Sequence, residues 1–191
     1  MLYSRKDDKT MIKIVIDPTG GGTQLGHQSF DKYAHIVEKD YVLSLSRLQQ
    51  DLLKRHHYDV VLTRYSDVDV SYFERLAQTK GVDLLISNHL NAGRKKGIEI
   101  RYAKHNDKIF ANNLKCAFED FGYMVRSCCK MEKPAENVQA YEPLIENSLA
   151  KSNVLVYYGY VDGPDYKTLI VGEREYAHAL LNAIEKTFKT A

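Results

Sequence analysis

One stretch of the sequence, residues 81–99, restricts the fold more than any other. Its apolar run at residues 82–87 has the composition of a buried strand, and it leads directly into Asn88-His89-Leu90. A short basic turn follows, and a second strand is expected to begin near Gly97. A buried strand that leads into a histidine brings an imidazole to the carboxyl end of a central strand, where open α/β sheets build their sites. His89 is therefore the first candidate functional residue.

Strand-like and helix-like segments alternate along the rest of the chain. Strands are expected at residues 12–16, 59–62, 82–87, 97–102, 123–127 and 153–158, and helices at 38–57, 71–80, 107–121 and 173–189, with a long loop at 24–37 and an irregular stretch at 130–152. This alternation predicts a single three-layer α/β domain, with a mixed, mostly parallel central sheet and helices on both faces. We place this domain at residues 11–191 and a flexible N-terminal extension at residues 1–10.

Composition excludes several classes of protein. A net charge of +2 does not argue for nucleic acid, and the short cluster Arg94-Lys95-Lys96 is interpreted as a solvated turn. No apolar run approaches the roughly 20 residues of a membrane span, and the charged N-terminus lacks the apolar segment of a signal peptide. The three cysteines show no metal-binding spacing and are typical of reduced thiols. We expect a protein made in the cytoplasm, then released by lysis or incorporated in a phage particle.

Short polar motifs follow the expected strands and open the first long helix. They are Asp17-Pro18-Thr19-Gly20-Gly21-Gly22, Glu38-Lys39, Thr63-Arg64 with Asp67, Ser87-Asn88-His89-Leu90-Asn91-Ala92 with Gly97-Ile98-Glu99, and the late strand Leu155-Val156-Tyr157-Tyr158-Gly159-Tyr160. In this order they resemble the zinc-dependent N-acetylmuramoyl-L-alanine amidases, which are peptidoglycan hydrolases with a phosphorylase/hydrolase-like fold. The resemblance covers nearly the whole chain and implies the same fold.

The resemblance also implies a zinc site. In that family a His of the first motif, the Glu of Glu-Lys and the His of Ser-x-His hold zinc, which leaves an open position for the water that the metal acidifies. A late Glu acts as general acid/base on the amide between N-acetylmuramic acid and L-alanine. Glu38 and His89 match two of the ligands, but Gly20 stands at the position of the first His. Tyr157 stands at the position of the late Glu, and a phenol with a pKa near ~10 is poorly matched to proton transfer at neutral pH.

These two replacements predict an amidase-like cell-wall domain that is catalytically degenerate and acts as a binding or structural module. Zinc held by Glu38 and His89 alone would be weak or absent. Asn91 and Tyr158 are the candidates for the substrate groove. The expected partner is a peptidoglycan fragment or a larger protein assembly.

Two alternatives stay open at this point. One is an active, endolysin-like zinc amidase in which His27 or His35 takes the missing ligand position. Glu99, Glu142 or Glu146 would then supply the carboxylate. The other is a purely structural assembly subunit, without cell-wall contact, whose cleft is filled by side chains.

Overall fold

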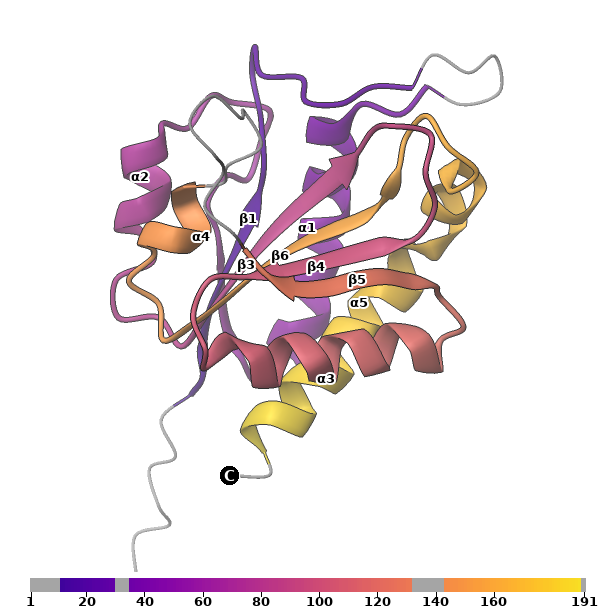
Figure 1. Cartoon of the computed structure of the whole chain (residues 1–191). Helices are drawn as coiled ribbons and strands as arrows, with labels where there is room; N and C mark the ends of the chain where they lie inside the picture. The colour runs from indigo at the N-terminus through magenta and orange to yellow at the C-terminus, as the bar shows by residue number, and fades with distance from the viewer. Residues whose placement is uncertain (1–10, 30–34, 132–142, 190–191) are drawn as a thin grey trace, which may run out of the picture.

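A computed structural model describes residues 11–29, 35–131 and 143–189 (Figure 1). The strands in this part of the chain are β1 (Lys13–Pro18), β2 (Asp59–Leu62), β3 (Leu84–Asn91), β4 (Ile98–Tyr102), β5 (Val125–Lys130) and β6 (Ser152–Tyr160). The helices are α1 (Glu38–Arg55), α2 (Tyr72–Ala77), α3 (Asp107–Asp120), α4 (Pro143–Asn147) and α5 (Tyr166–Phe188).

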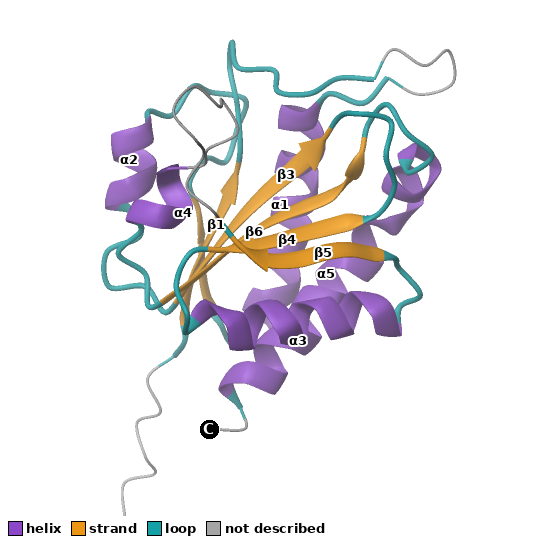
Figure 2. Ribbon diagram, in the orientation of Figure 1, coloured by secondary structure: helices purple, strands orange, loops and turns teal. Residues whose placement is uncertain are grey.

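All of these strands belong to one six-stranded sheet, in the order β2-β1-β3-β6-β4-β5 (Figure 2). Strands β2, β1, β3 and β6 pair in parallel, whereas β4 runs antiparallel to β6, and β5 pairs in parallel with β4. The predicted mixed, mostly parallel sheet is confirmed. Because β1, β3 and β6 are neighbours and parallel, their carboxyl ends meet at one edge of the sheet.

The sheet is covered on both faces, as predicted. Helices α1, α3 and α5 cover one face, and the short α2 and α4 lie on the other (Figure 1). The larger apolar core lies beneath α1, α3 and α5 and includes Ile16, Leu45 and Phe118, all fully buried. Each such side chain contributes roughly 1.5–3 kcal/mol relative to exposure, so this layer dominates the stability of the fold.

A closed ring of buried polar side chains fixes β3 against α1. The Asn88 amide donates to Ser46 Oγ at 2.8 Å and to Gln49 Oε1 at 2.7 Å. Gln49 Nε2 donates to the Tyr158 hydroxyl at 2.8 Å, and that hydroxyl donates to Asn88 Oδ1 at 2.9 Å. Because every member has a partner, the ring orients the end of β3 without leaving a buried polar group unsatisfied.

The largest differences from the predicted bounds are at β3 and α5. Strand β3 continues through His89 to Asn91, with a register shift against β6 between those two residues. Helix α5 begins at Tyr166 rather than near 173. Gly172 does not interrupt the helix but lies inside it, where its missing side chain leaves room for the ring of Tyr176 and the Tyr123 hydroxyl.

Two predictions concern segments that lie wholly or partly outside the described residues. The extension predicted at residues 1–10 lies outside the described residues, and so does part of the irregular stretch at 130–152, whose described part contains α4. Among the described helices, none has the length and apolarity that crossing a membrane requires.

Candidate functional site

Glu38 and His89 meet at the carboxyl edge of the sheet, as the sequence motifs predict. Glu38 is the first residue of α1, and His89 lies near the end of β3; both are buried. Glu38 Oε1 lies 3.4 Å from His89 Nδ1 and accepts the backbone N–H of Leu90 at 3.0 Å. The first turn of α1 therefore points a buried carboxylate at the histidine of the central strand.

His27 completes this contact from the long loop before α1. Its backbone N–H donates to Glu38 Oε2 at 2.7 Å, and its Nδ1 lies 3.0 Å from the same oxygen. Gly26 permits this approach, because a Cβ at this position would lie 2.5 Å from Glu38 Oε2. Of the two substitutes predicted from sequence, His27 thus reaches Glu38, whereas His35 is exposed.

The electrostatics of this cluster favour an ionised carboxylate. Burial alone would raise the pKa of Glu38, but hydrogen bonds from His27 and His89 outweigh it and lower the pKa to about 2. The hydrogen bond to Glu38 raises the pKa of His27, against the opposing effect of burial. The side chains of Glu38 and His27 therefore stabilise each other's charged forms.

A second chain of contacts orients His89 from beneath. Ser87 Oγ donates to Asp17 Oδ2 at 2.9 Å and lies 3.0 Å from His89 Nε2. The Ser87 oxygen therefore links Asp17 to the Nε2 side of the His89 ring. This arrangement turns Nδ1 of His89 toward Glu38. The roles of Ser87 and Asp17 were missed at the sequence level, although both residues belong to the motifs.

The backbone at Gly20 has no room for a side chain. Gly20 has φ +68°, and a Cβ built there would lie 2.6 Å from the Gln24 carbonyl oxygen and 3.2 Å from Lys39 Cβ. The guanidinium of Arg75 holds the Gly20 carbonyl, and it also pairs with buried Asp17 at 2.7 Å. The position of the family's first histidine is therefore part of a tightly held turn.

The Glu-Lys motif contributes to the same turn through its lysine. Lys39 Nζ donates to Gly22 O at 2.8 Å and to Asp67 Oδ2 at 2.7 Å. Asp67 Oδ1 in turn accepts the N–H of Gly22 at 2.7 Å. These contacts give a structural reason for the lysine and for the aspartate that follows Thr63-Arg64.

Tyr157, at the position of the family's late Glu, lies beside His89. The two residues are register partners, and their ring centroids are 5.4 Å apart. Glu99, the register partner of Tyr157 on β4, is buried and is contacted by the Tyr160 hydroxyl, by Arg101 at 3.2 Å and by Arg126 at 3.6 Å. The carboxylate nearest to Tyr157 along the sheet is therefore engaged by three donors.

The remaining candidates are dispersed. Asn91 is half-buried at the end of β3, where its Oδ1 accepts the N–H of Ala92. Tyr158, the other candidate for the substrate groove, lies largely beneath the helices, where it lines a depression of about 200 Å³ with Gly97 and Asp165. It is only 2 % exposed, because adjacent residues of a strand point to opposite faces and Tyr158 points under the helices. Glu146 lies on α4, and Glu142 lies outside the described residues.

The donor atoms do not form a metal centre as they are arranged. Among residues 11–29, 35–131 and 143–189, no group of three or more His, Cys, Asp or Glu side chains could hold a metal ion. Both oxygens of Glu38 accept backbone N–H groups, from His27 and Leu90, besides facing the two imidazoles. His27, Glu38 and His89 are the right types of ligand for zinc, but their contacts are those of a hydrogen-bonded cluster.

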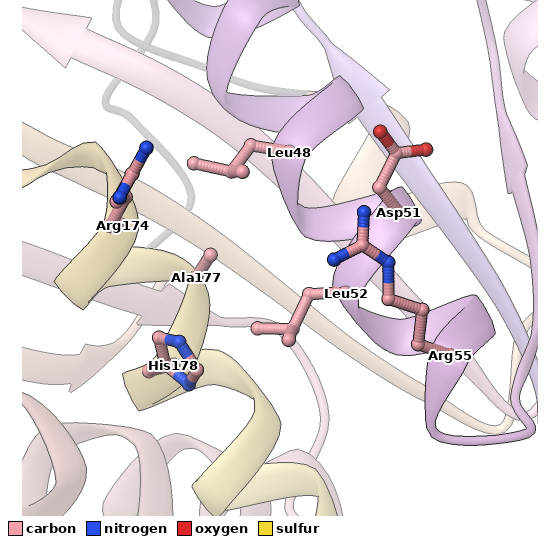
Figure 3. A pocket seen from close by; sticks show the side chains of 7 residues that line it. All are labelled: Leu48, Asp51, Leu52, Arg55, Arg174, Ala177 and His178. Carbon is pink, nitrogen blue, oxygen red and sulfur yellow. The ribbon is translucent and has the colours of Figure 1, made fainter.

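A separate depression of about 380 Å³ lies between α1 and α5 (Figure 3). Apolar side chains and charged side chains share its lining, which consists of Leu48, Asp51, Leu52, Arg55, Arg174, Ala177 and His178. At about 1.5 Å per residue, Leu48 lies roughly 15 Å along α1 from Glu38. This depression is therefore distinct from the Glu38–His89 edge.

The α/β sheet and the Glu38–His89 pair at its carboxyl edge define a domain with a site at the usual place in an open α/β sheet. The profile of the N-acetylmuramoyl-L-alanine amidase family matches residues 14–186. The chain therefore belongs to this family.

Individual relatives agree with the assignment. The probable cell wall amidase LytH of Staphylococcus aureus is 28% identical over 160 residues, which cover 82% of this chain and 50% of LytH. The chain thus spans about half the length of this curated relative. The catalytic domain of CwlV, an N-acetylmuramoyl-L-alanine amidase from Bacillus (Paenibacillus) polymyxa var. colistinus, superposes with a TM-score of 0.79 at 21% identity, covering 95% of this chain and all of that domain. Cwp6 from Clostridium difficile gives a TM-score of 0.76 at 27% identity, over 93% of this chain and 29% of Cwp6.

Proposed function

We propose that this chain binds peptidoglycan through the amidase scaffold without cleaving it by the family's route. The turn at Gly20 carries this proposal, because it leaves no space for the side chain that supplies the first zinc ligand elsewhere in the family. Tyr157 supports it further, because it replaces the general acid/base with a phenol.

The test separates binding from turnover. Purified peptidoglycan is sedimented with the protein, and the soluble fraction is analysed for released peptides in zinc-supplemented buffer. The expected result is sedimentation of the protein with no release of peptides above a protein-free control. Sustained release of stem peptides at zinc concentrations that other amidases need would contradict the proposal. An absence of sedimentation would contradict its binding half.

A second candidate is a zinc amidase in which His27 replaces the missing ligand. The contact of 3.0 Å between His27 Nδ1 and Glu38 Oε2 favours it, because the imidazole already lies beside the two matching ligand residues. This candidate requires the hydrogen-bonded cluster to rearrange around the metal.

Metal analysis distinguishes the two candidates. The zinc amidase predicts one zinc per chain after growth in zinc-replete medium, with loss of that zinc in His27→Gln and no loss in His178→Gln, an exposed histidine on α5. Sub-stoichiometric zinc that His27→Gln leaves unchanged would reject it.

A further inference from the structure

The turn between β3 and β4 carries three consecutive cations, Arg94, Lys95 and Lys96, which we call the basic turn. Two carboxylates of the β6–α5 connection hold its backbone. Asp162 accepts the N–H groups of Gly93 and Arg94 at 2.9–3.0 Å. Asp165 accepts the N–H of Gly97 at 2.9 Å. The basic turn is therefore held at both ends before any ligand arrives.

Among the described residues, the cationic side chains of the basic turn make no hydrogen bond or close ion pair, although Arg94 attracts the Asp162 carboxylate at longer range. The side chains of Arg94, Lys95 and Lys96 are all exposed. The nearby carboxylate of Asp162 is engaged by backbone N–H groups. The basic turn presents exposed cations on a fixed backbone. It is preorganised for an anionic ligand, because little conformational entropy of the backbone remains to be lost on binding.

Arg94 lines a depression of about 490 Å³ that adjoins the Glu38–His89 edge. One wall of the depression includes Ser29, which is two residues from His27 in the chain. Another wall includes Val161, whose N–H donates to the carbonyl oxygen of Asn91, and Asn91 is two residues from His89. Two residues of extended chain span at most about 7 Å, so the depression begins next to the cluster. Tyr166 adds a half-buried aromatic wall.

We propose that the basic turn, through Arg94, binds a carboxylate of the peptide stem when a muramoyl peptide occupies this edge of the sheet. This inference rests on the proposed function. In a muramoyl peptide the carboxyl group of muramic acid is consumed by the amide bond, so the free carboxylates lie on the peptide and not on the sugar. A planar guanidinium matches a carboxylate with two parallel hydrogen bonds, and it is the group expected at such a subsite.

The test uses two ligands that differ only in charge. N-acetylmuramoyl-L-alanyl-D-glutamate and its diamide, in which both free carboxylates are replaced by carboxamides, are titrated into the full chain, with binding measured by calorimetry and backbone NMR shifts. We expect the acid to bind about fivefold more tightly than the amide, the upper range for an exposed ion pair, and to shift Gly93 and Arg94. Arg94→Gln should remove this preference. Arg174→Gln, which removes an exposed cation from the depression between α1 and α5, should keep it.

The outcomes separate this inference from the proposed function. If peptidoglycan sediments with the protein but acid and amide bind equally, the subsite is wrong and the proposed function stands. If the acid binds in an Arg94-dependent manner while peptidoglycan does not sediment, the subsite stands and the proposed function falls. If inorganic phosphate competes as well as the acid does, the basic turn is a general anion site and the carboxylate assignment is overturned. If neither ligand binds, the subsite is wrong.

Discussion

The turn at Gly20 gives the sharpest quantitative prediction. Replacing Gly20 by alanine places a Cβ in the left-handed region and 2.6 Å from a carbonyl oxygen. The backbone conformation alone costs about 1–2 kcal/mol for a residue with a side chain. Relief of the contact requires the turn to shift, and overpacking of this kind costs a further ~1–3 kcal/mol. We therefore expect the free energy of unfolding to fall by roughly 2–5 kcal/mol.

A second glycine separates these two contributions. Gly81 has nearly the same backbone conformation, with φ +73°, but a Cβ there would have no neighbour within 4 Å. Gly81→Ala should therefore lose only the backbone component, about 1–2 kcal/mol. Urea denaturation of both variants, followed by circular dichroism, measures the difference.

Gly20→His extends the same reasoning to function. It restores the family's residue type, but the turn cannot accept it, so we expect a loss of stability at least as large as that of Gly20→Ala and no gain of bound zinc. If Gly20→Ala is no less stable than Gly81→Ala, or if Gly20→His folds normally and binds stoichiometric zinc, the structural basis for a degenerate site is refuted.

Two further variants test the scaffold. Tyr158→Phe leaves two buried amide side chains without their hydroxyl partner and should lower the free energy of unfolding, measured by urea denaturation, by about 1–3 kcal/mol. Tyr176→Phe is the control and should cost less, because the Tyr176 hydroxyl makes only a 3.5 Å contact. Equal losses in the two variants would contradict a role for the ring of polar side chains. Burial raises the pKa of Asp83, but hydrogen bonds from Lys151 and a backbone N–H prevail and lower it. Its stabilising contribution is therefore present above the pKa of the unfolded chain and lost as the pH falls through the folded pKa. Asp83→Asn should accordingly be less stable than the parent at neutral pH, with the gap closing in acid; a gap that stays constant with pH would reject this assignment.

Much of the fold followed from local patterns in the sequence. Apolar runs bounded by turn residues predicted the strands and their buried character, because a strand covered on both faces must be apolar throughout. The motif at residues 87–92 predicted the edge at which Glu38 and His89 meet. Helix α5 was predicted too short, because a glycine inside a helix resembles a boundary until the side chain that packs against it is known.

Local sequence could not decide contacts made across the loops. It left both His27 and His35 as substitutes, since only the close approach of the backbone at Gly26 brings one of them, His27, to Glu38. Nor could it show that Tyr158 lies beneath the helices, because this depends on which residues of β6 face them.

The sequence by itself determined the family, the order of the elements and two residues of the candidate site, because these depend on residue types at short spacing. Tertiary structure defined the surroundings of that site. Whether another residue can replace the histidine that is missing at Gly20 depends on three features of the fold. These are the space around the turn, the hydrogen bonds that engage Glu38 and the position of His27. These are contacts between residues distant in the chain, and only the folded arrangement defines them.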